Sequence, residues 1–181
     1  IPFQIIEDPT DLARADKLIL PGVGAFDATM KKVIDSGLKS ALDEEVLIKK
    51  KPVLGVCVGM QILGNGSEEG TLPGLGWIKG KVKKFDLNKL SDKPFLPHMG
   101  WNTIEPKVNH DIFKDLDHEL GLYFVHSYYF ETEDSRNILS TSVYGDEFAS
   151  AVFNNHIFGM QFHPEKSHFN GIQLLKNFAE L

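Results

Sequence analysis

The single cysteine of the chain, Cys57, lies in the segment PVLGVCVGMQILG (residues 52–64), between Gly55 and Gly59. The apolar run before it is typical of a buried strand, and the residues after it are spaced as in a helix. A side chain on such a turn projects above the sheet, as the serine of the G-x-S-x-G elbow does in hydrolases. A helix N-terminus favours the thiolate, so we expect a lowered pKa for the thiol. We predict that Cys57 is a nucleophile; the alternative is a buried structural cysteine.

A cysteine nucleophile needs a base and a group that orients the base. The segment IFGMQFHPEKS (residues 157–167) supplies both types of side chain, in His163 and Glu165. Two residues apart in an extended segment, they share a side, and Pro164 between them favours the extended form. We predict that His163 takes the thiol proton and that Glu165 fixes its tautomer. Taken alone, a histidine near a strand end is more often a surface or capping residue.

The first half of the sequence alternates strands and helices. Apolar runs predict strands at residues 3–6, 17–22 and 52–57. Helical spacing predicts helices at 26–37, where Gly37 is the C-terminal breaker, and at 38–50. This alternation indicates a parallel α/β sheet, and the near-continuous apolar character of the strand before Cys57 is typical of burial on both faces.

The second half predicts closely spaced strands joined by hairpins or a meander. The strand candidates are residues 74–85, 97–104, 122–130, 138–145, 148–155 and 157–164, and a short amphipathic helix follows at 171–181. No linker rich in proline, glycine or serine divides the two halves. The sequence therefore predicts one α/β domain over residues 1–181.

The composition is that of an ordinary soluble protein of 181 residues, 42% hydrophobic and 24% charged. The formal net charge of -6 gives no reason to expect nucleic acid or an anionic membrane as a partner. One cysteine forms no internal disulfide and no zinc cluster, and we expect no metal and no cofactor. No apolar run is long enough to cross a bilayer, and no signal peptide is recognisable, so the cytoplasm is the expected location.

The motifs PGVGAF, GVCVGMQ and HPE together resemble those of the class I, triad-type glutamine amidotransferases. A longer series resembles the glutaminase subunits of imidazole glycerol phosphate synthase: PGVGAFDATM, LGVCVGMQIL, SEEG with GLGWIKGKV, PHMGWN, YFVHSYY and GMQFHPEKS run in order through nearly the whole chain. The resemblance implies the class I amidotransferase fold, a flavodoxin-like, mostly parallel sheet with flanking helices, followed by an antiparallel, strand-rich second half.

The resemblance implies that Cys57 attacks the side-chain carboxamide of L-glutamine. His163 is then the general acid and base, Glu165 orients it, and a thioester forms before water releases glutamate. The positions that match the family's substrate-binding residues are Gln61, Glu69, Ser127 and Tyr128. Glu69 is a suitable partner for the substrate ammonium group. Gln61 lies one helical turn after the nucleophile and faces the same way.

Two sets of backbone amides are candidates for an oxyanion hole. The amide of Val58, directly after the nucleophile, is one natural donor. The segment PGVG, which contains Gly22, Val23 and Gly24, matches the family's oxyanion strand, where glycine allows a peptide to rotate. By itself PGVG is equally typical of an ordinary glycine-rich turn.

The resemblance also implies a partner, a (β/α)8-barrel synthase subunit that docks over the Cys57 site and receives the ammonia. The family is expected to be a poor glutaminase without this partner, and our hypothesis is that docking reorients the PGVG loop. The candidates for the docking face are His98, Gly100, Trp101 and Asn102. A tryptophan among small and polar residues is typical of an interface anchor, although it is equally compatible with a core position.

The sequence departs from the family pattern in two places. Family members open with a strand and helix carrying a D-Y-G-x-G-N-type segment before the equivalent of Ile1, and this sequence lacks that segment. We therefore expect the N-terminal strand and helix to be missing and two strand edges to be exposed. The second departure is His168 in KSHFNG, where a small residue is expected. This segment is similar to paralogues that supply ammonia to an amidotransferase of surface-polysaccharide amino sugars.

Three alternatives to the histidine-pathway subunit remain open from the sequence. One is the polysaccharide paralogue, which shares the chemistry and differs in the acceptor. Another is a cysteine hydrolase of the same elbow architecture acting on peptides or small esters. The last is an inactive interaction module, which the intact set of Cys57, His163 and Glu165 disfavours.

Overall fold

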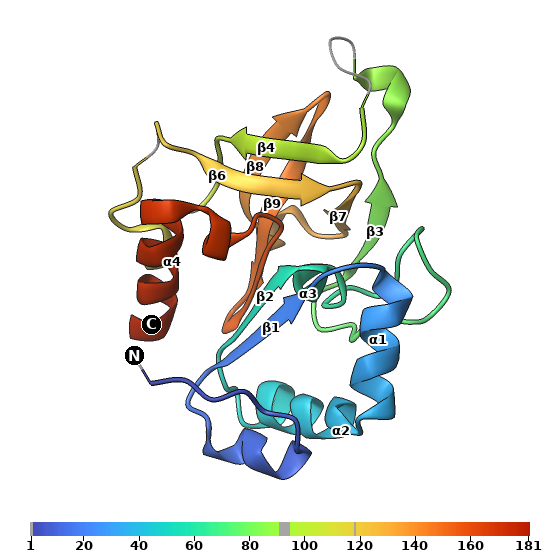
Figure 1. The fold of residues 1–181 in the computed structure, drawn as a ribbon, viewed down its shortest axis with the longest axis vertical. Coiled ribbons are helices and arrows are strands. Elements are labelled where there is room, and N and C mark those ends of the chain that lie inside the picture. The colour runs from blue at the N-terminus through green and yellow to red at the C-terminus, as the bar shows by residue number, and fades with distance from the viewer. Residues whose placement is uncertain (1, 91–94, 118) are drawn as a thin grey trace.

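The structure is a computed structural model that describes residues 2–90, 95–117 and 119–181. Its first half contains β1 (Leu18–Gly22), α1 (Phe26–Asp35), α2 (Leu38–Asp43), β2 (Val53–Cys57) and α3 (Val58–Gln61). Its second half contains β3 (Gly80–Lys84), β4 (His98–Asn102), β5 (Glu105–Pro106), β6 (Leu122–His126), β7 (Tyr128–Thr132), β8 (Ile138–Tyr144), β9 (Asp146–Asn154), β10 (Ile157–Met160) and α4 (His168–Glu180). Figure 1 shows their arrangement.

The main sheet is mixed. Among the described residues it has the order β1-β2-β10-β9-β7-β3, with β8 paired to β9 and β5 paired to β8. The pairs β1–β2 and β10–β2 are parallel, and the remaining pairs between these strands are antiparallel. The sheet is thus less parallel than predicted, because the second half is joined by short turns that cannot carry a parallel crossover. The α/β class is confirmed, as is the antiparallel character of the second half.

A small second sheet contains only β4 and β6 among the described residues, paired antiparallel. In Figure 1 these two strands cross the upper part of the molecule in front of β8 and β9. Aromatic rings fill the space between the two sheets. Phe124 of β6 lies 6.0 Å from Phe148 of β9, measured between ring centroids, and is fully buried.

The chain passes from the small sheet to the main sheet at one residue, Ser127. His126 ends β6 and Tyr128 begins β7, so the predicted strand at 122–130 is two strands in different sheets. The backbone N–H of Phe85 donates to the carbonyl of Ser127 at 3.2 Å. The connection is therefore an abrupt change of direction, and this hydrogen bond holds it at Ser127.

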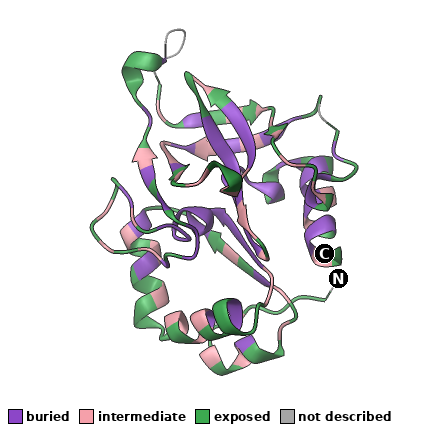
Figure 2. Ribbon diagram, turned by 180° about the vertical axis from the view of Figure 1, so that it is seen from behind, coloured by how far each residue is buried: buried purple, intermediate pink, exposed green. Residues whose placement is uncertain are grey.

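The core lies on both sides of β2, where all five residues are buried. Figure 2 shows this buried centre, with much of the outer face of α1 exposed and most of α2 only partly buried. On the side of α4, Phe178 packs 6.2 Å from Phe158 of β10. In the part of the chain that the structure describes, no helix is long and apolar enough to span a membrane.

The strand predicted at residues 3–6 is wrong. The structure has no strand before Leu18 in the described residues, and Phe3 and Ile5 are 90% and 79% exposed. Apolar character alone predicted a buried strand here, but no neighbouring strand in the described ranges pairs with the segment. The predicted strand at 17–22 is confirmed as β1, for which β2 is the partner in the described sheet.

Candidate active site

Cys57 lies at the carboxyl end of β2, where the strand turns into α3. Its backbone has φ 55° and ψ -112°, a conformation that L-residues rarely adopt. In the sheet register it is opposite Gly22, the last residue of β1, and β10 runs along the other side of β2. The carboxyl ends of three parallel strands, β1, β2 and β10, thus lie next to the sulfur. The predicted strand-to-helix turn at Cys57 is confirmed.

The strained turn depends on glycines that allow α3 to approach β1. A β-carbon on Gly59 would lie 1.8 Å from the carbonyl oxygen of Leu20, and one on Gly55 would lie 2.4 Å from the carbonyl oxygen of Gly59. The same is true of Gly22, where a β-carbon would lie 2.3 Å from the backbone nitrogen of Gly59. These three positions therefore require glycine, because any side chain would push the turn away from the sheet.

The thiol of Cys57 is protonated at rest, which contradicts the expectation from the helix N-terminus. The side chain is 5% exposed, and burial raises its pKa to about 11. A hydrogen bond from the Val58 backbone acts in the opposite direction, and the nearby charges of Glu165 and Glu69 add to the increase. A four-residue helix has a weak dipole, so desolvation decides the protonation state.

His163 and Glu165 form the predicted pair. The imidazole Nδ1 lies 2.6 Å from a carboxylate oxygen of Glu165. Because a carboxylate accepts hydrogen bonds, the neutral imidazole carries its proton on Nδ1, and Nε2 has a free lone pair. Nε2 is buried and has no hydrogen-bond partner within the described ranges. This is the arrangement that a general base needs, with the tautomer fixed and the basic nitrogen unoccupied.

The cysteine and the histidine belong to neighbouring strands. His163 follows the end of β10 by three residues, and β10 is paired with β2 up to Met160 opposite Val56. The backbone N–H of His163 donates to the carbonyl of Tyr123 at 2.8 Å, which fixes the segment beside β6. Among the described residues no hydrogen bond joins the sulfur to the imidazole; the sulfur accepts one from Gln161 instead, at 3.7 Å.

Two glutamines and a tyrosine carbonyl line the floor behind the sulfur. The side-chain amide of Gln61 donates to the carbonyl of Tyr128 at 3.2 Å and to Oε1 of Gln161 at 3.1 Å. Both glutamines are buried, Gln161 completely. Gln61 and Tyr128 are predicted from the sequence, whereas Gln161 is not. The available signal was a polar residue inside the apolar strand IFGMQF, whose partners lie 100 or more residues away.

Glu69 and Ser127 lie at the margins of this site. The carboxylate of Glu69 accepts a hydrogen bond from the backbone N–H of Phe26 at 2.8 Å, at the start of α1. Its side chain is exposed, and its charge acts on the Cys57 thiol. Ser127 is half-buried at the connection between β6 and β7. Both positions are compatible with contacts to a ligand above the sulfur.

The candidate oxyanion donors surround the same turn. Val58 follows the nucleophile and is buried, whereas Val23 is 78% exposed. Gly24 has φ 92°, the left-handed region that favours glycine, and a β-carbon there would meet open space. Gly22 thus packs closely against α3, whereas a side chain at Gly24 would meet no neighbouring atoms.

The candidate docking residues divide between two faces of β4. Met99 and Trp101 are 61% and 48% exposed, and the Trp101 ring stacks on His168 with the rings 5.3 Å apart and an interplanar angle of 4°. His98 is only 4% exposed, although it is one of the residues that line the surface cavity on this side, so its place on a docking face stays a prediction. Strand alternation explains its burial, because residues next to one another face opposite sides.

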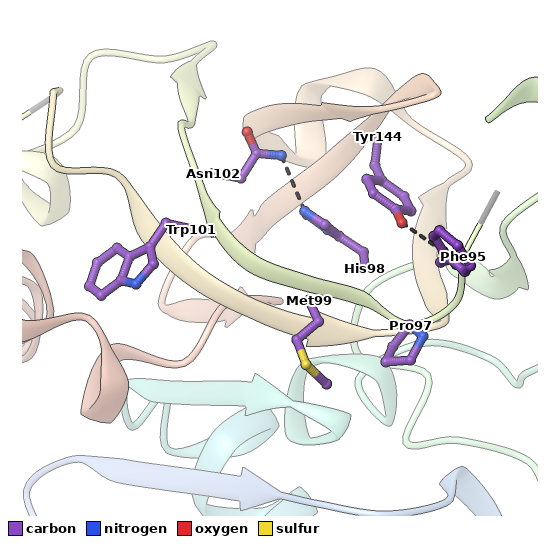
Figure 3. A pocket seen from close by; sticks show the side chains of 7 residues that line it. All are labelled: Phe95, Pro97, His98, Met99, Trp101, Asn102 and Tyr144. Carbon is purple, nitrogen blue, oxygen red and sulfur yellow. Dashed lines mark hydrogen bonds between the residues drawn. The ribbon is translucent and has the colours of Figure 1, made fainter. Parts of the chain in front are cut away.

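A surface cavity of about 390 Å³ adjoins these residues (Figure 3). Its lining includes Trp101, Met99 and Phe95 together with the partly buried Asn102, and Tyr144 closes one side. The sequence was equally compatible with an interface and a core position for Trp101, and at 48% exposure the side chain is not in the core. No group of three metal-ligating side chains occurs in the described parts of the chain.

Comparison with known proteins agrees with this geometry. The family model "Glutamine amidotransferase class-I" matches residues 2–181. The imidazole glycerol phosphate synthase subunit HisH of Leptospira borgpetersenii is 46% identical over 98% of this chain and 87% of its own length. HisH 2 of Pseudomonas aeruginosa is 51% identical over 94% of this chain and 83% of its own length.

Solved structures share the fold. A crystal structure of a glutamine amidotransferase has a TM-score of 0.68 at 18% identity, covering 97% of this chain and 83% of that one. A glutamine amidotransferase from Thermotoga maritima has a TM-score of 0.58 at 19% identity, covering 93% of this chain and 66% of that one. By family match and by sequence identity, the chain belongs to the class I glutamine amidotransferases, and within them to the HisH subunits of imidazole glycerol phosphate synthase.

Proposed function

We propose that Cys57, His163 and Glu165 hydrolyse the side-chain amide of L-glutamine, and that the ammonia passes to the synthase subunit that forms imidazole glycerol phosphate in histidine biosynthesis. The single observation that carries the catalytic assignment is the buried Nε2 of His163, unpartnered within the described residues, with the proton held on Nδ1 by Glu165 at 2.6 Å. An imidazole in this state accepts a proton at one defined atom.

The first half-reaction starts from a neutral thiol. His163 takes the thiol proton as the sulfur attacks the amide carbon, and the C–S bond forms while the carbonyl becomes an oxyanion. The imidazolium then gives that proton to the leaving nitrogen, and the C–N bond breaks to release ammonia and a γ-glutamyl thioester. In the second half-reaction His163 takes a proton from water, which attacks the thioester. Glutamate leaves, and the thiol recovers its proton.

The remaining site residues have binding roles in this proposal. Glu69 pairs with the substrate ammonium group, while Ser127 and Tyr128 hold the α-carboxylate end. Gln61 positions the amide above the sulfur. Val58 N–H and the peptide between Val23 and Gly24 are the oxyanion donors.

A free thiol with a pKa of about 11 is almost entirely protonated at neutral pH, which makes the isolated chain a slow nucleophile. We propose that the partner docks over the face of β4 that carries Met99 and Trp101. Docking then turns the loop at Gly22–Gly24 and supplies the second oxyanion donor. Hydrolysis would then proceed when the acceptor subunit is present, and ammonia would not be lost as ammonium in water. The exposed Val23 and the open space at Gly24 leave room for this rotation.

The test is mass spectrometry of the chain after treatment with a glutamine-mimicking electrophile, with and without glutamine. We expect one label on Cys57, slowed by glutamine, and none in Cys57→Ala. A label that glutamine does not slow would replace the proposal with a hydrolase of another substrate. Glutamate release is then measured with the histidine-pathway barrel subunit. Stimulation only by a synthase of polysaccharide amino sugars would reassign the acceptor and leave the chemistry unchanged.

A further inference from the structure

A series of polar side chains, with two buried histidines in its middle, connects β4 to the site, and the proposed reaction uses neither histidine. It runs from Asn102 to His98, then to His126, and ends on the backbone carbonyl of Tyr128. The donor-to-acceptor distances are 3.3 Å from Asn102 Nδ2 to His98 Nε2, 3.0 Å between His98 Nδ1 and His126 Nε2, and 2.8 Å between His126 Nδ1 and the Tyr128 oxygen. His98 and His126 are 4% and 6% exposed. Figure 3 shows the Asn102 end, beside the surface cavity.

The position of every proton in this series follows from its last acceptor. A backbone carbonyl only accepts, so Nδ1 of His126 carries a proton. Burial lowers the pKa of His126 to about 3 and that of His98 to about 4, so both rings are neutral at pH 7. The Nε2 of His126 therefore accepts from Nδ1–H of His98, and the Nε2 of His98 accepts from the Asn102 amide. Both imidazoles are Nδ1–H tautomers.

The Tyr128 carbonyl is shared with the catalytic side of the molecule. It accepts one hydrogen bond from His126 and a second from Gln61 at 3.2 Å. Gln61 also donates to Gln161, which in turn donates to the Cys57 sulfur at 3.7 Å. The hydrogen bonds are thus continuous from the cavity beside Trp101 to the nucleophile.

The Tyr128 carbonyl belongs to the peptide between Tyr128 and Tyr129, at the start of β7 and one residue after the chain changes sheets, so the orientation of this peptide needs a constraint of its own. The two donors on the Tyr128 oxygen supply that constraint. We propose that His126 and His98 are positioning residues that fix this peptide and, through Gln61 and Gln161, the direction of the sulfur. This inference rests on the proposed function, in which Ser127 and Tyr128 bind the end of the glutamine substrate.

A purely structural role would be filled equally well by phenylalanine. His98 and His126 lie in an aromatic cluster: the His98 ring is 4.9 Å from Phe124, and the His126 ring is 5.3 Å from both Phe85 and Phe148. A phenyl ring matches this packing and needs no hydrogen-bond partners. The positioning role and the packing role therefore make different predictions for a phenylalanine variant.

The experiment compares His126→Phe with His126→Asn, each assembled with the barrel synthase subunit. Phenylalanine removes the donor to Tyr128, whereas the Nδ2 of asparagine occupies the place of the imidazole Nδ1. We expect kcat/KM for glutamine to fall about tenfold in the phenylalanine variant, mainly through KM, and to return to within about threefold of wild type in the asparagine variant. His98→Phe, which frees His126 to change tautomer, should lose about threefold.

Phe124→Leu is the matched control, because it disturbs the same cluster and leaves the hydrogen bonds in place. It should retain the wild-type KM at a temperature where all variants are folded. Nitrogen-15 NMR of the imidazoles should report Nδ1–H tautomers for both histidines in the wild type. A wild-type kcat/KM in His126→Phe, a KM effect in Phe124→Leu equal to that in His126→Phe, or an Nε2–H tautomer would each overturn the inference.

Failure of the proposed function can be told apart from failure of this inference. Alkylation of Cys57 by iodoacetamide needs no glutamine pocket, and its rate depends on where the sulfur points. If glutamine does not slow the labelling of Cys57 by the glutamine-mimicking electrophile in the wild-type chain, the glutaminase proposal is refuted. The iodoacetamide rates would still decide the positioning role: a change of about threefold or more in His126→Phe, reversed in His126→Asn, supports it, and equal rates in all three proteins refute it.

Discussion

Gly59 in α3 packs so closely against Leu20 in β1 that a β-carbon on Gly59 would lie only 1.8 Å from the Leu20 carbonyl oxygen. This contact fixes how closely α3 approaches the sheet, and α3 begins at the residue after the nucleophile. The strained conformation of Cys57, with φ 55°, is therefore supported by packing two residues away.

Gly59→Ala should accordingly damage both the fold and the site. The added methyl group forces α3 away from β1, and overpacking of this kind costs about 1–3 kcal/mol in the free energy of unfolding. The rate of Cys57 labelling should fall with it. Denaturant unfolding and labelling kinetics measure the two effects. Gly66→Ala is the control, because its nearest neighbour would be 3.9 Å from the new β-carbon and both quantities should be unchanged.

The burial of the thiol makes a prediction about pH. With a folded-state pKa of about 11, the thiolate fraction rises roughly tenfold per pH unit between about pH 7 and pH 10. The rate of iodoacetamide reaction with the isolated folded chain should follow this slope and still be rising at the upper end of that range. In urea, where burial is lost, the same rate should level off near the ordinary thiol pKa of 9.0. A plateau near neutral pH in the folded chain would show that the thiol is already activated.

Sequence reasoning located the parts of this site that lie in short contiguous motifs. The apolar strand before Cys57 and the glycines beside it predict a turn, and the spacing of His163 and Glu165 predicts their pairing. Both inferences use local geometry, which depends on neighbours in the sequence. For the same reason the positions of β1, β2, α1 and the later strands followed from periodicity.

The errors and omissions concern properties set by distant contacts. The pKa of Cys57 depends on how much of the fold covers it, and the inward direction of His98 depends on which side of β4 faces β8 and β9. Gln161 can be recognised as a site residue only when the fold places it beside Gln61, 100 residues away. The predicted strand at 3–6 failed because a strand requires a partner as well as an apolar sequence.

The hydrogen bond from Nδ1 of His163 to Glu165 should be required for turnover rather than for substrate binding. Glu165→Gln replaces the carboxylate by an amide, which accepts more weakly and can donate to Nδ1, moving the imidazole proton to Nε2. We expect kcat to fall about 10²–10⁴-fold with little change in KM. Steady-state kinetics of the assembled synthase measure this split. Glu133→Gln makes the same chemical change at an exposed carboxylate and should leave both constants unchanged.

The neutral pair His98 and His126 should make the fold sensitive to acid. In the unfolded chain each histidine binds a proton near pH 6.5, whereas burial lowers the folded-state pKa to about 4 and about 3. Below pH 6.5 the unfolded state therefore binds more protons, and the free energy of unfolding falls as the pH falls. Each histidine contributes a slope of at most about 1.4 kcal/mol per pH unit.

The difference between wild type and His126→Phe isolates this effect from the titration of carboxylates. The free energy of unfolding is measured in urea between about pH 6 and pH 4.5. It should fall less steeply with falling pH in the variant, by a slope equivalent to at most about one bound proton. Above about pH 7 the two slopes should coincide, because both histidines are neutral in both states. Equal slopes across the acidic range would mean that His126 is charged or accessible in the folded chain.

The last prediction concerns the switch proposed at Gly24, whose φ of 92° is outside the range of proline. Gly24→Pro fixes φ near about -65° and prevents the loop from keeping its observed conformation or rotating from it. We expect stimulation of glutamate release by the barrel subunit to be lost, while unstimulated labelling of Cys57 continues. Gly37→Pro is the matched control, since Gly37 has φ 72°, also faces open space, and follows α1. Because both variants incur the same kind of backbone strain, a loss of stimulation confined to Gly24→Pro assigns the switch to this loop, and equal stimulation in both would remove the loop from the coupling.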